Sequence, residues 1–439
     1  MCAAVHPVKA VLFALLACPA LALAQPIAPG EPPAPTVEDL VQAADATADV
    51  AAVTAVAEPA PNDDIDLASL GLDPTANAFD DKLNIYGYAD VLYSGYSFRK
   101  DIAITDSQRG FAMGNLDLYV SKNFTADWRF LAEVRFLTLP NGGYNPDSTI
   151  VATRIGDPQN FLRGQVWGGI SIERAYLEYD ITDHLTIRAG RFLTPYGVWN
   201  IDHGSPVIIS PIRPFIIGEQ HFPEHQQGIE LFGEYLIDDY RIGYHGTLSN
   251  GRGPTESNND RDTNLAIGGR LSLEAPFMGT LKLGVSAYSG RFTGTAPLGD
   301  APDSYDERSY GADVQWLRGP LHVQAEITYD ARRFLDGHRA RVGTSFRTND
   351  RQYGGYVLAG YRFDRFWNVM PYVMIEHDEP MRSHDAFDGV IGYSAGLNFR
   401  PTPTIVLKGA YQLANLRGER GYLEGTDIDI FTMQAAWVF

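Results

Sequence analysis

The feature that most constrains the fold is a strict alternation of apolar and polar residues, which begins at Leu83 and continues to the C-terminus. In residues 128–136 an apolar side chain falls at every second position, and residues 321–330 repeat the pattern. Successive side chains of a β-strand point to opposite faces of the sheet. A period of two therefore indicates strands with one apolar and one polar face, and sixteen such segments predict an all-β fold.

The connections between these segments alternate between short and long. Seven are short, such as 182–184 and 237–239, and eight are long, such as 138–169 and 193–226. A soluble β-sandwich has no reason to segregate loop length in this way, whereas a transmembrane barrel keeps its short turns on one side and its long loops on the other. Closure also removes the sheet edges that lipid could not satisfy. We therefore predict a transmembrane antiparallel β-barrel of about 16 strands, formed by residues 81–439.

Aromatic residues are placed in agreement with a membrane barrel. Trp128, Trp316 and Trp367 each flank a short turn, and Trp437 lies at the same predicted level near the C-terminus. Such a level is typical of an interfacial aromatic girdle. The chain ends on Phe439 after an alternating strand, and this resembles the C-terminal signal read by the outer-membrane assembly machinery of Gram-negative bacteria.

Residues 1–24 have the three parts of a secretory signal peptide. Lys9 supplies the positive charge, 10–17 (AVLFALLA) form the apolar region, and 22–24 (ALA) form a small-x-small cleavage site before Gln25. The alternative of a transmembrane anchor is disfavoured, because about 20 apolar residues are needed to span a bilayer.

Both cysteines, Cys2 and Cys18, lie within this leader, so the mature chain has neither a disulfide framework nor thiol chemistry. Residues 15–18 (LLAC) loosely resemble a lipoprotein signal modified at Cys18. Pro19 and the better cleavage site before Gln25 argue against that alternative.

Residues 25–80 differ in composition from the rest of the chain. They are rich in alanine and proline, and they carry eleven acidic residues but no lysine or arginine. This composition predicts a periplasmic linker, with an interaction helix over 36–57 as an alternative. The net charge of −19 argues against a nucleic-acid partner, which would need a basic face.

One long connection, 193–226, is too apolar and too rich in proline for an ordinary surface loop or a regular element. We expect it to fold into the barrel and narrow the lumen, with its apolar residues of 207–217 against the inner wall or along the subunit contact. An extracellular loop that packs on its neighbours is the alternative, and metal binding or hydrolysis by its histidines is a weaker one. The polar residues expected to face the water path are Asn200, Asp202, His203, Arg213, Glu219, His221, Glu224 and His225.

Strand parity identifies the charged residues of the inner face. Over all the strands it gives ten basic and eleven acidic candidates, so no field of a single sign is expected. A wall salt bridge that stiffens the barrel is the alternative role for each of them. The residues predicted to line the pore are Arg129, Arg135, Arg174, Arg188, Arg241, Arg270, Lys282, Glu133, Glu178 and Glu230.

Several motifs resemble the phosphate-selective porin O and P family of Gram-negative outer-membrane porins. They are 187–192 (IRAGRF) with 194–197 (TPYG), 227–231 (QGIEL), 248–253 (LSNGRG), 353–361 (YGGYVLAGY) and 396–399 (GLNF). The resemblance implies a sixteen-stranded barrel, usually trimeric, in which the loop between strands five and six folds inward.

The same resemblance implies a water-filled channel for passive diffusion of small hydrophilic solutes or ions, without a cofactor or a catalytic residue. The implied partners are outer-membrane lipids, lipopolysaccharide and two further copies of the chain. The basic ladder of phosphate-selective members has no residue-by-residue match here, so anions such as phosphate are one solute class among others. The alternative function is an outer-membrane barrel with an enzymatic, adhesive or structural role and no open pore.

Overall fold

The computed structural model describes residues 82–99, 109–136, 170–201, 203–218, 220–253, 262–293, 304–335, 341–342, 345–346, 350–363, 368–380, 388–417 and 425–439. The chain divides into two units, Met1–Asn62 and Asp63–Phe439, and every described residue lies in the second unit. The predicted signal peptide and the predicted linker of 25–80 therefore fall outside the described residues.

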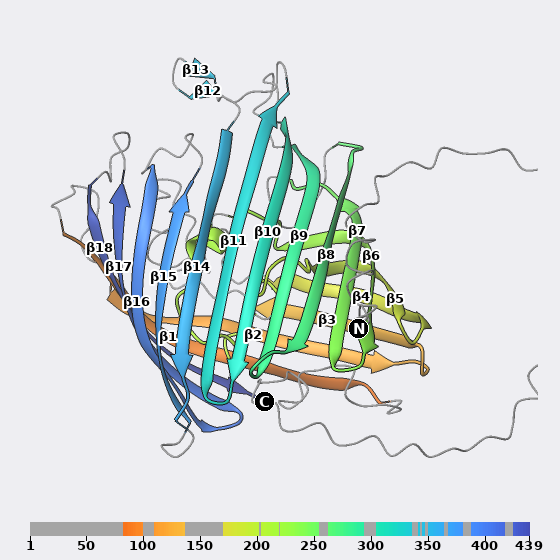
Figure 1. Ribbon diagram of the computed structural model, residues 1–439, viewed down its shortest axis with the longest axis horizontal. Coiled ribbons are helices and arrows are strands. Elements are labelled where there is room, and N and C mark those ends of the chain that lie inside the picture. Colours follow the sequence, from red (N-terminus) through yellow and green to blue (C-terminus); the bar gives the residue numbers. More distant parts are fainter. Residues whose placement is uncertain are drawn as a thin grey trace, which may run out of the picture. The chain divides into compact units, whose positions relative to one another are not determined.

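Sixteen antiparallel strands form one closed barrel, and strands that follow each other around it lie side by side in Figure 1. The short helix α4 (Phe215–Gly218) and a two-stranded sheet of β12 (Arg341–Val342) and β13 (Ser345–Phe346) are the other elements among the described residues. No helix in this described part is long and apolar enough to cross a membrane. The barrel strands are β1 (Asn84–Phe98), β2 (Arg109–Asn123), β3 (Trp128–Phe136), β4 (Ile170–Thr182), β5 (Leu185–Leu193), β6 (His225–Ile237), β7 (Tyr240–Asn250), β8 (Leu265–Pro276), β9 (Thr280–Thr293), β10 (Ser304–Arg318), β11 (Leu321–Phe334), β14 (Asp350–Tyr361), β15 (Val369–Glu379), β16 (Gly389–Thr402), β17 (Ile405–Arg417) and β18 (Asp427–Val438).

The predicted all-β barrel and its sixteen strands are confirmed. Each barrel strand pairs with its neighbour in sequence, and β1 pairs with β18 to close the ring. Reciprocal hydrogen bonds of 2.9 Å between the backbones of Gly87 and Phe439 extend this closing pair to the last residue. No barrel strand is left with an unpaired edge, which is the condition for a sheet in lipid.

Strand β10 illustrates why the alternating sequence gives this barrel. Its outward face is apolar between two arginines, Arg308 and Arg318, and its inward face carries polar residues such as Ser309 and Asp313. The two arginines are separated by about 33 Å of strand, or roughly 25 Å along the barrel axis at a tilt of about 40°. This is the height of the apolar band of a membrane barrel. The outward side chains between the arginines are Tyr310, Ala312, Val314 and Trp316.

The sequence pattern placed the start of this strand too late. It predicted a strand over 309–317, whereas β10 begins at Ser304. Residues 304–308 lie beyond the apolar band, so Asp306 and Arg308 stand on the outward face where aliphatic residues would otherwise mark the period. The short strands β12 and β13 were not predicted, because two residues are too few to show a period.

Trp128, Trp316 and Trp437, the members of the predicted girdle that the structure describes, lie where the turns predict them. Trp128 begins β3 directly after a short turn, and Trp316 lies near the end of β10, where its indole donates a hydrogen bond of 3.1 Å to the carbonyl of Phe277 in the neighbouring turn. Trp437 pairs with Ala89 next to the C-terminus. Trp367 falls outside the described residues.

The outer face allows a direct test of depth in the bilayer. Ile327 is 64% exposed and pairs with Ala312, close to the middle of the apolar band, whereas Leu265 is 60% exposed at the long-loop end of β8. We predict that Ile327→Arg lowers the free energy of unfolding by about 2–4 kcal/mol and Leu265→Arg by about 0–1 kcal/mol, because the cost of a charge falls toward the interface. Denaturant unfolding in lipid vesicles measures both, and equal losses would contradict the assignment.

Candidate functional site

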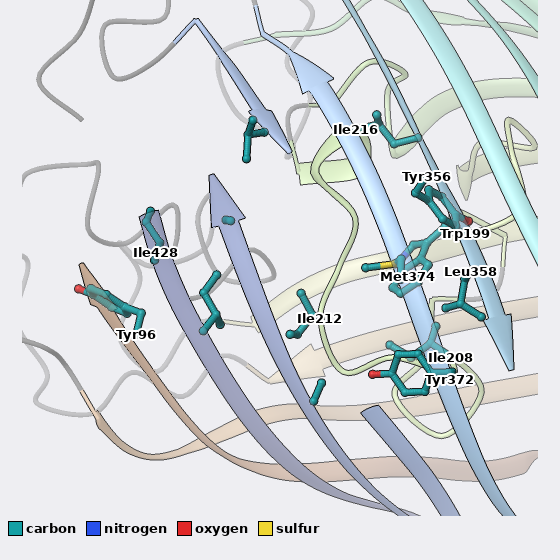
Figure 2. Close-up of a cluster of buried hydrophobic side chains, with 14 of the residues drawn as sticks. Tyr96, Trp199, Ile208, Ile212, Ile216, Tyr356, Leu358, Tyr372, Met374 and Ile428 are labelled. Atoms are coloured by element: carbon teal, nitrogen blue, oxygen red, sulfur yellow. The ribbon is translucent and has the colours of Figure 1, made fainter. Parts of the chain in front are cut away.

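Residues 194–224, which we call the inner segment, connect β5 to β6 and fold into the barrel. They are described apart from Asp202 and Glu219. Ile208, Ile212 and Ile216 are buried against inward side chains of β14 and β15, and Figure 2 shows this contact. Each fully buried aliphatic side chain contributes roughly 1.5–3 kcal/mol, which offsets the entropy lost on ordering the segment. The wall side chains in this contact are Tyr356, Leu358, Tyr372 and Met374.

The polar backbone of the inner segment is held by side chains of the wall. The carboxylate of Glu326 on β11 accepts a hydrogen bond of 2.7 Å from the amide of Trp199. The carboxylate of Glu376 on β15 accepts one of the same length from the amide of Phe215. The segment has little secondary structure of its own, so the wall satisfies backbone groups that would otherwise be buried without partners.

Donors from β16 and β17, the next strands around the barrel after β15, complete this attachment. Arg400 donates a hydrogen bond of 2.6 Å to the carbonyl of Pro206, and Lys408 donates to the carbonyl of Ser205. The hydroxyl of Ser205 in turn donates to Asp90 on β1, which also accepts a hydrogen bond of 2.7 Å from Asn115 on β2. The segment is therefore bonded to strands on several sides of the lumen.

The two ends of the inner segment lie together. The amide of Thr194 donates to the carbonyl of Glu224 at 3.0 Å, and the side-chain amide of Asn200 donates to the same carbonyl at 3.1 Å. The hydroxyl of Thr194 donates to the carbonyl of Pro223 at 2.6 Å. This clasp makes the segment a closed loop whose base is fixed at the wall.

The structure describes six of the eight polar residues that the sequence predicts to face the water path. Those six residues are buried or half-buried and contact the clasp or the wall. Asn200 serves the clasp, Arg213 donates to Glu224 at 2.9 Å, and His203 lies 3.8 Å from the same carboxylate. Asp202 and Glu219 lie outside the described residues.

The other two histidines are almost fully buried between the segment and the wall. The Nε2 atom of His221 lies 3.0 Å from a carboxylate oxygen of Asp378, and its Nδ1 lies 2.6 Å from the hydroxyl of Thr328. The Nε2 atom of His225 lies 2.8 Å from a carboxylate oxygen of Glu173. His221 therefore attaches the segment to an inward carboxylate, and His225, the first residue of β6, contacts another one next to the clasp, because a buried carboxylate needs a donor.

Burial and neighbouring charges shift the pKa values of His203 and Glu224 in the clasp. Burial lowers the pKa of His203 to about 4, even though Glu224 opposes the shift, because the imidazolium is poorly solvated there. Burial alone would raise the pKa of Glu224, but Arg213 and the two neighbouring histidines, His225 and His203, lower it to about 2. The clasp therefore holds an ionised carboxylate beside a neutral imidazole.

A titration tests this assignment. The pKa of His203 is about 4 in the folded protein, below the value of about 6.5 in an unfolded chain, so the unfolded chain binds more protons between these values. The contribution of neutral His203 to stability is thus complete above about pH 6.5 and is lost as the pH falls through about 4. We predict an imidazole ¹³C NMR titration with a midpoint near pH 4, assigned by comparison with His203→Gln. A midpoint near 6.5 would show that the imidazole is solvated.

In a row of ion pairs on the inner faces of β3 to β6, the arginines are more exposed than the carboxylates. The guanidinium of Arg188 contacts Glu178 at 2.6 Å and Glu230 at 2.7 Å, and the guanidinium of Arg174 contacts Glu133. These carboxylates are 1–5% exposed, whereas the two arginine side chains are 19–20% exposed. In these pairs, arginine is therefore the more accessible of the two charges.

Aromatic rings hold these arginines in place. The guanidinium of Arg188 lies over the rings of Tyr176 and Phe232, at 4.3 and 4.6 Å from their centroids. That of Arg174 lies 5.4 Å from the ring centroid of Tyr119. Stacking of this kind orders a long side chain and favours its charge.

The remaining predicted lining residues are also inward, and most form wall salt bridges. Arg129 contacts Glu178 and Asp180, and Arg135 is 3% exposed and contacts Asp117 at 2.7 Å. Toward the short-turn end the pairs are more exposed: Arg241 lies 3.3 Å from Glu234 and Lys282 lies 3.8 Å from Glu274. Arg270 pairs with Asp313 and is buried. The salt-bridge alternative therefore describes much of this wall.

Sequence parity missed Glu173, which strict alternation assigns to the lipid face. A β-bulge in β4 opposes Glu133 with Arg174 and Val134 with Ile172, so Glu173 is the extra residue. Its side chain is 1% exposed and contacts Arg135 at 3.5 Å. A carboxylate at a lipid-facing position in mid-strand is the signal that could have indicated this bulge.

A cavity lies between the inner segment and the charged wall. His203 and Val207 border it from the segment, and Glu133 and Arg174 border it from β3 and β4. Tyr88 and Tyr119 complete the lining from β1 and β2. The cavity therefore places Arg174, one of the more accessible arginines of the wall, opposite the inner segment.

In the part of the chain that the structure describes, no group of three or more histidine, cysteine or acidic residues could hold a metal ion.

Several solved structures share this architecture. An anion-selective porin from Comamonas acidovorans matches with a TM-score of 0.53 at 11% identity, covering 82% of this chain and 99% of the porin. OprB from Pseudomonas putida matches at 0.51 and 10%, covering 82% and 95%. OmpF from Salmonella typhi matches at 0.50 and 16%, covering 82% and 98%. At these identities the likeness shows the porin-type barrel fold.

No family model and no curated protein matches the sequence. The predicted resemblance to the phosphate-selective porins therefore stays a hypothesis that rests on the sequence motifs alone.

Proposed function

We propose that the chain forms an outer-membrane porin of a Gram-negative bacterium. Small hydrophilic solutes or ions would diffuse passively through its water-filled lumen, and the inner segment would form the constriction. A sixteen-stranded barrel without an insert keeps a wide aqueous channel, so selection by size needs such a segment.

One observation carries this proposal. A closed barrel with an apolar outer band also has a charged inner wall, and a segment attached to several of its strands crosses the lumen. An adhesive or structural barrel needs neither the charged wall nor the crossing segment. Fixed wall contacts suit a constriction, because a sieve must keep its dimensions.

The proposals for the leader, the linker, assembly and oligomeric state rest on the sequence. The leader of 1–24 would be removed, and the linker of 25–80 would lie in the periplasm. The assembly machinery would recognise Phe439, and the barrel would form a homotrimer, as the resemblance to phosphate-selective porins implies. Anions are the solute class that we propose enters more readily, because the arginines of the inner wall are more accessible than their carboxylates.

Removing the centre of the inner segment tests the constriction. The clasp brings the ends of the segment together, so residues 205–222 can be replaced by two glycines without straining β5 or β6. We predict that the deletion raises single-channel conductance in planar bilayers several-fold and admits larger uncharged solutes, because the lumen then approaches that of an open sixteen-stranded barrel.

The deletion variant must first show the heat-modifiable electrophoretic shift of a folded barrel. Unchanged conductance and solute cutoff in such a variant would exclude the segment as the constriction. A wild-type protein without conductance would instead favour the enzymatic or adhesive alternative, which assays of lipase activity and cell adhesion then separate.

Charge selection is tested at Arg174, which borders the cavity beside the segment. We predict that Arg174→Gln lowers the anion-to-cation permeability ratio by about twofold or more, because it leaves Glu133 as the nearer charge. Reversal potentials in a salt gradient measure this ratio. Arg318→Gln removes the same charge from the outward face and should leave the ratio unchanged. An equal change in both variants would show that the lumen charge does not act locally.

A further inference from the structure

Four arginines gather on the outward face of the barrel at the long-loop ends of neighbouring strands. They are Arg291 on β9, Arg308 on β10, Arg333 on β11 and Arg351 on β14. We call them the rim patch. Arg308 and Arg351 both pair in register with Ala331 and so lie in one row, while Arg291 and Arg333 flank Asp306 in the next row. Side chains two residues apart on a strand share a face, so all four point away from the lumen.

A row of tyrosines lies directly below the rim patch. Tyr310 pairs with Tyr329, and Tyr329 pairs with Tyr353, one outward step nearer the middle of the barrel. These rings are 38–52% exposed. The next outward step is aliphatic, with Ile327 in register with Ala312. This order, from aliphatic to tyrosine to arginine, is that of a barrel crossing from hydrocarbon to headgroups.

The step between rows sets the depth of the guanidiniums. Two residues of strand advance about 7 Å, or roughly 5 Å along the axis of a tilted barrel. The rim patch therefore lies just outside the aromatic girdle, at the level of polar headgroups. Because the long loops of a barrel face the outside, this is the outer leaflet, an assignment that rests on the proposed function.

The charge of the rim patch is not balanced by its own residues. Asp306 contacts Arg291 at 2.8 Å, and no salt bridge to Arg308 or Arg333 occurs among the described residues. Glu379 on β15 pairs in register with Tyr353 and lies 3.6 Å from His377. Among the described residues, three carboxylates, Asp306, Glu379 and Asp262 beside Arg291, thus stand near four guanidiniums.

Another part of the same rim shows the opposite arrangement. The guanidinium of Arg99, at the end of β1, contacts Asp429 at 3.0 Å and Asp427 at 3.5 Å. That cation is neutralised within the protein, whereas the rim patch leaves positive charge facing outward. Guanidiniums pair with phosphate oxygens through two parallel hydrogen bonds, so uncompensated arginines at headgroup depth indicate a phosphate-bearing partner.

We propose that the rim patch binds the phosphate groups of an outer-leaflet glycolipid, the lipid A part of lipopolysaccharide. The tyrosine row would contact the sugar and the first carbons of the acyl chains, and the arginines would contact the phosphates. Both parts are needed for a lipid, whereas a free phosphate ion would use the arginines alone. The site lies on the outer face and takes no part in passage through the lumen.

The test measures binding of diphosphorylated lipid A to the full-length protein in detergent by native mass spectrometry. The patch variant carries Arg308→Gln, Arg333→Gln and Arg351→Gln. The control variant carries Arg99→Gln, Lys122→Gln and Arg318→Gln, which removes the same total charge from other outward positions. We predict that the patch variant binds lipid A roughly 10- to 100-fold more weakly and that the control stays within about threefold of wild type.

Two further arms use the wild-type protein and do not depend on the folding of a variant. Lipid A stripped of its phosphates should bind at least tenfold more weakly, and equimolar inorganic phosphate should not displace the diphosphorylated form. Equal binding of both lipids, equal loss in both variants, or displacement by free phosphate would overturn the proposal. Conductance is recorded separately. A conducting wild type without selective lipid binding refutes only the rim patch, and a non-conducting protein that binds lipid A selectively refutes only the porin function.

Discussion

The hydrogen bonds that join β1 to β18 close the sheet on itself, and the arrangement of the lumen depends on that closure. A barrel strand has both of its backbone edges occupied by neighbours, so the inner segment cannot add to the sheet. It has to satisfy its backbone in another way. Glu326, Glu376 and Arg400 supply that alternative, since their side chains reach amides and carbonyls that a neighbouring strand would otherwise have paired.

This use of charged side chains explains why the inner wall carries so many of them. A carboxylate that accepts a hydrogen bond from a buried amide, as Glu376 does, costs desolvation but satisfies a group that would otherwise be orphaned. Elsewhere on the wall, buried carboxylates such as Glu133 and Glu230 need cationic partners, and arginine supplies them. The arginine side chain is longer than the glutamate side chain with which it pairs, so its guanidinium extends further into the lumen. Unequal exposure of the two charges follows from this difference in length.

The outer face carries apolar side chains where the inner face carries polar ones, and both follow the same period of two. Between Arg308 and Arg318 on β10 the outward positions hold only apolar and aromatic side chains, because lipid cannot solvate a charge. Beyond the tyrosine row that restriction ends, and arginines appear on four strands within the next two rows. The positions of outward charges therefore mark the boundary of the apolar band, and the sign of those charges points to the chemistry of the headgroups.

Local pattern alone determined much of this protein. The period of two, the alternation of short and long connections and the aliphatic run of 207–217 were sufficient to predict sixteen strands, a closed barrel and an inward segment, because each depends on sequence-local side-chain order. Tertiary structure decided which side chains meet. The sequence placed Asn200 and His221 toward a water path, but both are buried, because Asn200 donates to a carbonyl of the clasp and His221 lies between Asp378 and Thr328 of the wall. The bulge at Glu173 reverses the face of one residue, and pairing with β3 fixes its position. The rim patch likewise exists only through register, since Arg308, Arg333 and Arg351 become neighbours when β10, β11 and β14 pair.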